Sequence, residues 1–364
     1  MTDLYRCTPR QVRQFIKDCL YAGLVPFVQS SPGMGKSSIM RSVADELKLK
    51  MIDHRLSTSA PEDLSGLPEF FSDSEGNRMA HFVPFGDLFP LESTPLPGVQ
   101  AIRDENSNLK YTEPTHQGWM LFLDEFNSAS KSVQAASYKL ILDRMTGQRK
   151  LHERCVITAA GNLATDRAIT NAISTAMQSR VVHLEMQIHF EEWLYDVALK
   201  EGYDSRIIAY LSQFPSKLMD FRPDHNEKTF CCPRTWEFTN RLIKDREVTD
   251  TMSMLLAGTI TSGVAVDFVQ FTKVFNNLVS IAEIMKDPEN CRIPNDIGSK
   301  WAITSHMMEK VTEENLDDLS TYVNRFTIDF RILFFRSILV RNPKLRQHPA
   351  FIRAMSSLAR YLHG

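Results

Sequence analysis

The chain has 364 residues, 43% of them hydrophobic, which is enough for two or three domains with substantial cores. Its 42 basic and 44 acidic side chains give a formal net charge of −2, so no global basic field attracts nucleic acid or an anionic membrane. No signal peptide or membrane-spanning run is visible, and the six cysteines lack metal-site or disulfide spacing, so we expect a soluble, cytoplasmic protein with reduced thiols.

The first half of the chain alternates expected helices with expected strands. A helix start at Thr8-Pro9 precedes apolar residues at helical spacing as far as Gly23. The remaining expected elements are strands at 24–29, 50–56, 119–123, 156–160 and 181–185, and helices at 37–47, 130–144 and 166–179. Because alternating strands and helices form right-handed crossovers, this order predicts an α/β fold, with a parallel five-stranded sheet between two layers of helices.

Other regions depart from this alternation. The segment 57–118 is rich in Pro, Gly, Ser and Asp and has no long periodic stretch, which is typical of an insertion or a functional loop. A charged hairpin is expected at 146–153. Beyond residue 187 the strand signals fade, and helical periods continue to Leu362, which predicts an all-helical region. An aromatic stripe there predicts a helical core or a subunit interface, and it consists of Phe326, Phe330, Phe334 and Phe335.

The stretch "SSPGMGKSS" lies between the first expected strand of the sheet and a helix, as a phosphate-binding loop does. It departs from the pattern G-x-x-x-x-G-K-[ST] at Ser30, at the strand exit, where a small residue is required. Gly33 and Gly35 can adopt positive φ and turn backbone N–H groups toward an anion. Lys36 is expected to contact the β- and γ-phosphates of ATP, and Ser37 to ligate Mg²⁺. The predicted ATP-binding residues of the loop are Ser31, Pro32, Gly33, Met34, Gly35, Lys36, Ser37 and Ser38. A chance match in a structural turn is the alternative.

Two further motifs follow at strand ends. "WMLFLDEFN" is an apolar strand that ends in Asp124 and Glu125, which is the form of a Walker B motif. Asp124 is expected to hold Mg²⁺ through its water shell, and Glu125 to orient and deprotonate the attacking water. "VITAAGN" ends in Asn162, which is expected to lie beside the γ-phosphate and help to position that water. The alternatives are an acidic pair that caps the next helix and an asparagine that only forms a turn.

In this order the motifs resemble those of the AAA+ ATPases, and specifically the MoxR-like branch. Similar proteins carry "LFLDELNRA", "AAGN", "ANRFVHLEL" and "SPRSWE" segments, and this chain has "LFLDEFNSA", "AAGN", "MQSRVVHLEM" and "CPRTWE". The resemblance covers roughly Phe15 to Ile243 and is highly specific, because separate motifs match at compatible spacings. It departs at Ser128, where the family commonly has an arginine, so the role of that arginine is not carried over.

The resemblance implies roles for two arginines. Arg180, in "QSRVV", matches the arginine finger that reaches the γ-phosphate bound by a neighbouring subunit. Arg234, in "CPRTWE", matches the sensor 2 arginine of the helical lid, which contacts nucleotide in its own subunit. The alternatives are that Arg180 is a helix C-terminal cation and Arg234 a solvated arginine after a proline that begins a helix.

The resemblance also implies an architecture and partners. It divides the chain into a nucleotide-binding core at 1–187, a helical lid at 188–265 and a C-terminal helical extension at 266–364. An arginine finger that acts in trans implies a homo-oligomeric ring, typically a hexamer. Similar proteins remodel a protein client with a partner that carries a von Willebrand factor A domain, and loops like those at 57–118 and 146–153 face the pore or the client.

Two other functions stay open on the sequence. One is a nucleic-acid motor or a GTP-using restriction-type subunit, in which Arg149, Lys150 and Arg154 could line a basic pore. The near-neutral charge and the lack of an added basic domain argue against nucleic acid as the partner. The other is a nucleotide-gated scaffold that binds ATP with little turnover. The intact Glu125, Asn162 and Arg180 argue against it.

Overall fold

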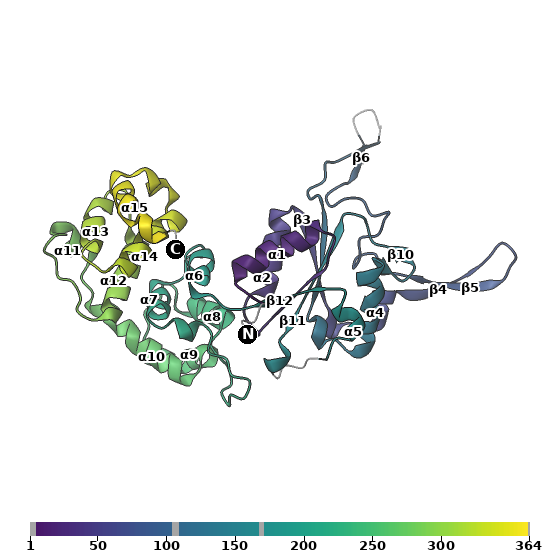
Figure 1. Cartoon of the computed structure of the whole chain (residues 1–364), viewed down its shortest axis with the longest axis horizontal. Helices are drawn as coiled ribbons and strands as arrows, with labels where there is room; N and C mark the ends of the chain where they lie inside the picture. Colours follow the sequence, from purple (N-terminus) through teal and green to yellow (C-terminus); the bar gives the residue numbers. More distant parts are fainter. Residues whose placement is uncertain (1–4, 104–108, 167–170, 363–364) are drawn as a thin grey trace. The chain divides into compact units, whose positions relative to one another are not determined.

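The structure is a computed structural model that describes residues 5–103, 109–166 and 171–362. The chain divides into two compact units, Met1–Gln187 and Ile188–Gly364. The first unit contains the parallel sheet and its covering helices, and the second is built from helices (Figure 1).

Within the described residues, the first unit has a six-stranded parallel sheet, so the predicted α/β class is confirmed. Its strands, in order across the sheet, are β1 (Arg6–Cys7), β12 (Val182–Met186), β2 (Pro26–Ser30), β11 (Cys155–Asn162), β8 (Gly118–Asp124) and β3 (Leu49–Arg55). The five predicted strands are all present, with ends shifted by one or two residues. The predicted number of strands was wrong, because β1 adds a sixth at the edge beside β12. A strand of two residues is too short to give a periodic signal.

Apolar side chains cover both faces of this sheet. Every residue of β8 is buried, and Leu121 and Leu123 join one core cluster while Met120 and Phe122 join another. Successive side chains of a strand point to opposite faces, so each cluster is one layer of the sandwich. On the Met120 side the layer includes α1 (Pro9–Tyr21) and α2 (Lys36–Glu46). On the Leu121 side it includes α4 (Lys131–Leu142) and two short helices, α3 (Pro61–Ser65) and α5 (Thr175–Gln178). The carboxyl ends of β2, β8 and β11 therefore meet at one edge of a sheet that is covered on both faces.

Hairpins interrupt the first unit where the sequence indicated an insertion and a charged hairpin. The elements are the 3-10 turn η1 (Leu56–Thr58), α3 (Pro61–Ser65), β4 (Leu67–Ser72) with β5 (Arg78–Val83), β6 (Ala101–Arg103) with β7 (Leu109–Tyr111), and β9 (Met145–Thr146) with β10 (Arg149–Lys150). The β4–β5 hairpin extends away from the sheet (Figure 1). The strands in 57–118 were missed because they pack on no core and carry apolar residues on both faces, which removes the alternation that predicts a strand.

The turn of the β9–β10 hairpin packs against the base of the β4–β5 hairpin. Thr146 is fully buried, and its Oγ1 donates a hydrogen bond to the carbonyl oxygen of Leu64 (2.8 Å). A Cβ at Gly147 would lie 2.6 Å from the carbonyl oxygen of Ser65 and 3.3 Å from that of Phe82. Only a glycine allows this approach of two backbones, so the two hairpins form a single packed body.

The helix predicted at 166–179 was wrong. The structure has the 3-10 turn η3 (Ala164–Asp166) and a single-turn helix α5 (Thr175–Gln178), and residues 171–174 are not helical, while 167–170 lie outside the described residues. Met177 is the buried residue of α5. With Met177 as the one buried side chain among residues 171–179, this part of the chain has no apolar stripe to hold a longer helix against the domain.

The second unit is a set of helices around one hydrophobic core. They are α6 (Phe190–Trp193), the π-helix η4 (Leu194–Ala198), α7 (Ser205–Gln213), α8 (Pro233–Ile243), α9 (Met252–Ile260), α10 (Ser262–Thr272), α11 (Ile281–Lys286), α12 (Ile297–Lys310), α13 (Leu316–Val323), α14 (Ile328–Arg341) and α15 (Pro349–Leu362). The predicted boundary between a lid and an extension at 265 lies within α10 and stays a prediction, and residues on both sides of it share the core. In the described parts of the chain, no helix has both the length and the apolar character of a membrane span.

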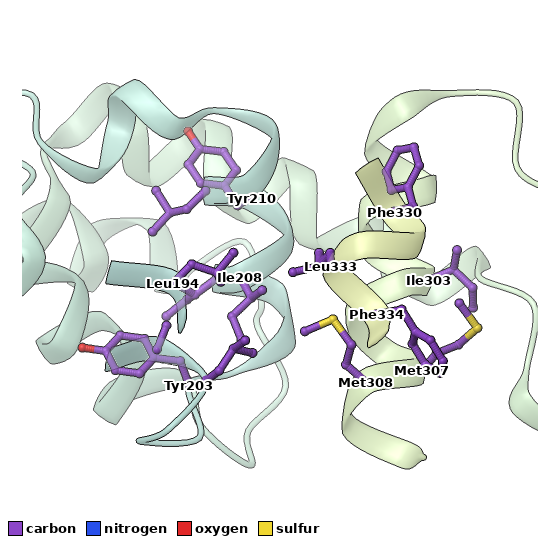
Figure 2. Close-up of a cluster of buried hydrophobic side chains, with 14 of the residues drawn as sticks. Leu194, Tyr203, Ile208, Tyr210, Ile303, Met307, Met308, Phe330, Leu333 and Phe334 are labelled. Carbon is purple, nitrogen blue, oxygen red and sulfur yellow. The ribbon is translucent and has the colours of Figure 1, made fainter. Parts of the chain in front are cut away.

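Figure 2 shows how distant helices of the second unit meet in this core. Ile208 and Tyr210 from α7 lie in the same cluster as Met308 from α12 and Phe334 from α14. The predicted aromatic stripe is part of it, because its members are at most 7% exposed: Phe326, Phe330, Phe334 and Phe335. The stripe is therefore helical core.

Candidate nucleotide-binding site

The glycine loop joins β2 to α2 at the carboxyl edge of the sheet. Gly35 is the N-cap of α2 with φ +87°, and Gly33 has φ +77°. Nothing lies within 4 Å of the position that a Cβ would take at Gly35, so glycine is favoured there by the left-handed backbone and not by lack of space. The loop brings the unpaired N–H groups of the first turn of α2 to the end of the sheet, which is where a phosphate binds in such a fold.

Lys36 lies across the strand ends beside this loop. Its Nζ donates to the carbonyl oxygen of Ser30 (3.0 Å), to Ser30 Oγ (3.2 Å) and to Asn162 Oδ1 (3.1 Å). Ser30 and Asn162 are opposite each other in the pairing of β2 with β11. The lysine therefore links the glycine loop to the end of β11, and the predicted roles of both residues at a γ-phosphate stay predictions.

Ser30 occupies a position that does not need glycine. It is fully buried at the end of β2, and its φ is not positive. Its hydroxyl donates to the carbonyl oxygen of Ser31 (3.0 Å) and accepts from Lys36. The side chain is thus satisfied within the loop, and the departure from the usual pattern leaves the cradle of Gly33 and Gly35 intact.

The side chains predicted to hold Mg²⁺ also meet. Ser37 Oγ donates to Asp124 Oδ2 (3.3 Å), and Asp124 is only 7% exposed. A hydroxyl and a carboxylate are oxygen ligands of the kind that Mg²⁺ prefers, so these two residues fit the ion. No cluster of three or more His, Cys, Asp and Glu side chains suited to a metal occurs among the described residues, so the other ligands would be phosphate oxygens and water.

Glu125 follows β8 with its backbone in the left-handed region, at φ +54°. Its carboxylate accepts a hydrogen bond from Ser57 Oγ and lies 3.8 Å from the Nε of Arg55. The alternative that the acidic pair caps the next helix is not supported, because Glu125 makes no side-chain cap and α4 is capped by Ser130 instead. The carboxylate therefore remains partly exposed beside Asp124 at the edge where the loop lies, which suits a base acting on water.

Sequence reasoning missed several residues near this edge. Ser57 and Arg55 hold Glu125, and Asn127 pairs with the backbone of Asn162. Burial and the nearby Asp124 carboxylate raise the pKa of Asp53, on β3. Asn127 ends the "WMLFLDEFN" segment, but the Walker B motif gives it no role. The contacts of all these residues depend on pairing between strands that are distant in sequence.

The structure shows the local surroundings of each predicted arginine within its own unit. Arg180 follows α5, is exposed, and donates through Nη1 to the carbonyl oxygen of Ala176. This contact is the helix C-terminal arrangement that was the alternative to an arginine finger. Arg234 is an exposed residue in the first turn of α8 and belongs to the second unit. The roles of both arginines stay predictions.

Comparison with known proteins gives similarity to solved structures only. No protein-family model matches the sequence, and no curated protein matches it. A RuvB variant from Thermotoga maritima is 13% identical, with a TM-score of 0.34, over 84% of this chain and 86% of that chain. NtrX from Brucella abortus in complex with ADP is 13% identical, with a TM-score of 0.34, over 96% of this chain and 68% of that chain. Similarity at this level carries no information about activity, so the chain's own residues carry the functional assignment.

Proposed function

We propose that this protein is a Mg²⁺-dependent ATPase of the AAA+ class and of its MoxR-like branch. The observation that carries the proposal is the convergence of two contacts at one edge of the parallel sheet. Lys36 meets Asn162, and Ser37 meets Asp124, although these pairs come from different strand ends. A chance turn of similar sequence has no reason to meet two separate polar strand ends in this way.

Each residue has a role that its position supports. The backbone of residues 31–38 and the ammonium group of Lys36 bind the phosphates, and the Lys36 contacts to Ser30 and Asn162 keep the ammonium group near them before nucleotide binds. Ser37 and Asp124 would hold Mg²⁺, which neutralises charge on the phosphates. Glu125 orients the attacking water and accepts its proton, and Asn162 helps to place that water.

The proposed assembly is a homo-oligomeric ring, typically hexameric, in which Arg180 of one copy completes the site of the next. Support comes from the exposure of Arg180 and from its contact with a backbone carbonyl of its own short helix, which it can exchange for a phosphate. Arg234 is proposed to contact nucleotide from the helical lid at 188–265. The extension at 266–364 completes the core of the second unit.

The proposed substrate of the motor is a protein, handled with a partner that carries a von Willebrand factor A domain. The β4–β5 hairpin supports a protein client, because it exposes large apolar side chains: Leu67, Phe70, Phe71, Met79, Phe82 and Val83. Its charged residues, Glu69, Asp73, Glu75 and Arg78, are mostly acidic. A surface that is apolar and acidic fits a polypeptide better than the phosphates of a nucleic acid.

The first experiment measures ATP binding and hydrolysis by Lys36→Ala and by Glu125→Gln. Lys36→Ala is expected to lose binding, and Glu125→Gln to keep binding and lose turnover. Lys131→Ala is the matched control, because Lys131 is the exposed first residue of another helix in the same unit. Unchanged nucleotide affinity in Lys36→Ala refutes the site, and absent turnover in the wild type at concentrations that favour assembly supports the scaffold alternative.

The second experiment identifies the client. The Glu125→Gln protein is loaded with ATP in an extract of its native cells, and the proteins that co-purify are identified, with and without Phe70→Asp. Phe70 is 69% exposed, so this change is expected to leave the fold and basal turnover unaffected and to abolish capture. Hydrolysis stimulated by nucleic acid with a steep salt dependence would instead support the nucleic-acid motor, with Arg149 and Lys150 as its contacts.

A further inference from the structure

Asn127 makes a two-sided contact with the backbone of Asn162. Its Nδ2 donates to the carbonyl oxygen of Asn162 (2.7 Å), and its Oδ1 accepts from the amide N–H of the same residue (3.0 Å). Asn127 is 3% exposed and lies in the 3-10 turn η2 (Phe126–Ser128), directly after Asp124 and Glu125. The side-chain amide thus binds the peptide groups of Asn162 as a neighbouring strand would, at the point where β11 ends.

This contact restricts which residue can occupy position 161, directly before Asn162. A Cβ at Gly161 would lie 2.2 Å from Asn127 Oδ1 and 2.8 Å from its Cγ. Gly161 does not have positive φ, so its backbone does not require glycine. Any larger residue at 161 would displace the amide of Asn127, and the glycine therefore preserves this contact.

The position of Asn127 itself is held by other groups. Its carbonyl oxygen accepts a hydrogen bond from the amide of Asn171 (2.6 Å), and Asn171 Nδ2 donates to the carbonyl oxygen of Ala129 (2.7 Å). These bonds anchor the backbone of the turn without touching Asn162. The side chain of Asn127 can therefore be changed while the turn that carries it stays anchored.

We infer that Asn127 is a positioning residue for Asn162 in ATP hydrolysis, which rests on the function proposed above. The contact connects the segment that bears Asp124 and Glu125 to the end of β11. Asn162 Oδ1 in turn lies 3.1 Å from Lys36 Nζ, so the amide of Asn127 sets the distance between the base and the side chain that places the water. Asn127 touches neither nucleotide-binding group directly and acts through Asn162.

The test measures kcat, KM and the affinity for ADP in Asn127→Ala, Asn127→Asp and Gly161→Ala. The expected result is a fall in kcat of about 10- to 100-fold, because misplacing a water-orienting group affects the reaction more than binding. The ADP dissociation constant is expected to stay within about 3-fold of the wild type. Asn127→Asp has the same shape and keeps the acceptor, but it replaces the donated bond with a repulsion between its carboxylate and the carbonyl oxygen of Asn162. Gly161→Ala leaves residue 127 unchanged and decides the matter where the variants at 127 do not fold.

The combined effect on kcat of substitutions at 127 and 161 distinguishes a positioning role of Asn127 from a structural role. Gly161→Ala is expected to lower kcat in the wild type and to lower it much less in Asn127→Ala, because the group that it displaces is already gone. Lys131→Ala is the matched control. Lys131 is the exposed first residue of α4 and takes no part in the contacts of Asn127, so kcat is expected to stay unchanged.

Three results have distinct meanings. A wild type that hydrolyses ATP while Asn127→Asp and Gly161→Ala keep its kcat overturns the inference alone. Equal falls in kcat and in ADP affinity, tracking a fall in melting temperature, overturn it as well, because they indicate general damage. A wild type that neither binds nor hydrolyses ATP overturns the proposed function instead.

Discussion

Ser30, the serine that replaces the first glycine of the phosphate loop, gives a sharp test of the site. Ser30→Ala removes only the hydroxyl, whereas Ser30→Gly also removes the Cβ. The side chain is fully buried and the backbone φ is not positive, so glycine has no conformational advantage at this position. We therefore expect both variants to bind nucleotide and both to be less stable than the wild type.

The size of the effect follows from the contacts of the hydroxyl. It donates to the carbonyl oxygen of Ser31 (3.0 Å) and accepts from Lys36 Nζ (3.2 Å). Lys36 keeps its bonds to the carbonyl oxygen of Ser30 and to Asn162, so Ser30→Ala leaves no buried charge unpaired. The change should lower the free energy of unfolding by about 1 kcal/mol. In Ser30→Gly the added backbone freedom lowers it by about 0.5–1 kcal/mol more.

Both variants are expected to bind nucleotide more tightly than the wild type, although both are less stable. Lys36 must exchange its present acceptors for phosphate oxygens, so removing one acceptor favours the bound state. At about 1 kcal/mol the dissociation constant would decrease by at most about 5-fold, in Ser30→Ala and Ser30→Gly alike.

Thermal melting and calorimetric titration with Mg²⁺ and ADP measure both quantities. For a unit of this size, about 1 kcal/mol corresponds to a decrease of about 2–4 °C in melting temperature. Ser42→Ala, on the same helix α2, serves as the control and should change neither quantity. Binding that is ten times or more tighter in Ser30→Gly than in Ser30→Ala would refute the reasoning, because the gain would come from glycine itself and the serine would be a defect of the loop.

Three more results are expected. Ser57→Ala frees the carboxylate of Glu125 from one hydrogen bond and should raise basal turnover by no more than about 5-fold, whereas a fall of ten-fold in a steady-state assay would mean that Ser57 orients the base. Burial and Asp124 raise the pKa of Asp53 in the folded protein, so the ionised form of Asp53 opposes folding. Asp53→Asn should therefore raise the melting temperature at pH 7 but not at pH 3, where the carboxyl is protonated in both the folded and the unfolded state. An equal change in melting temperature at both pH values would contradict this cause. Phe334→Ala removes a fully buried ring and should cost about 3–5 kcal/mol in urea unfolding, while Phe238→Ala, at 42% exposed, should cost less than about 0.5 kcal/mol; similar losses would contradict the packing described for the core.

Residues close in sequence made the loop and the strands predictable. The glycines of the phosphate loop, its lysine and the apolar strand before Asp124 each follow a local rule, and the structure brings Lys36 to Asn162 and Ser37 to Asp124. The aromatic stripe of the second unit was also predicted, because helical spacing directly reports a buried face.

What the sequence could not predict depends on pairing between distant segments. The contact of Ser57 with Glu125 follows from the pairing of β3 with β8, and that of Asn127 with Asn162 from the pairing of β8 with β11. The exposed β4 and β5 strands lack a buried face, so no periodicity marks them. The helix at 166–179 was expected, but in the part of it that the structure describes Met177 is the one buried side chain, so little packing holds a helix there.

The contact between Gly147 and the base of the β4–β5 hairpin limits how this region of the protein can be re-engineered. The backbone at Gly147 packs against the backbone of Ser65 and Phe82, and the hydroxyl of Thr146 donates to the carbonyl oxygen of Leu64. Removing either hairpin would therefore expose groups that are packed or hydrogen-bonded against the other. Transplanting the β4–β5 hairpin into another ATPase would require the 145–150 turn as well. Replacing it with a hairpin of different length would succeed only if the residues at its base, including Ser65 and Phe82, keep their backbone path. The sequence of the exposed end of the β4–β5 hairpin can therefore vary freely. Substitutions at the base of the hairpin require compensating substitutions at 145–150, more than sixty residues further along the chain.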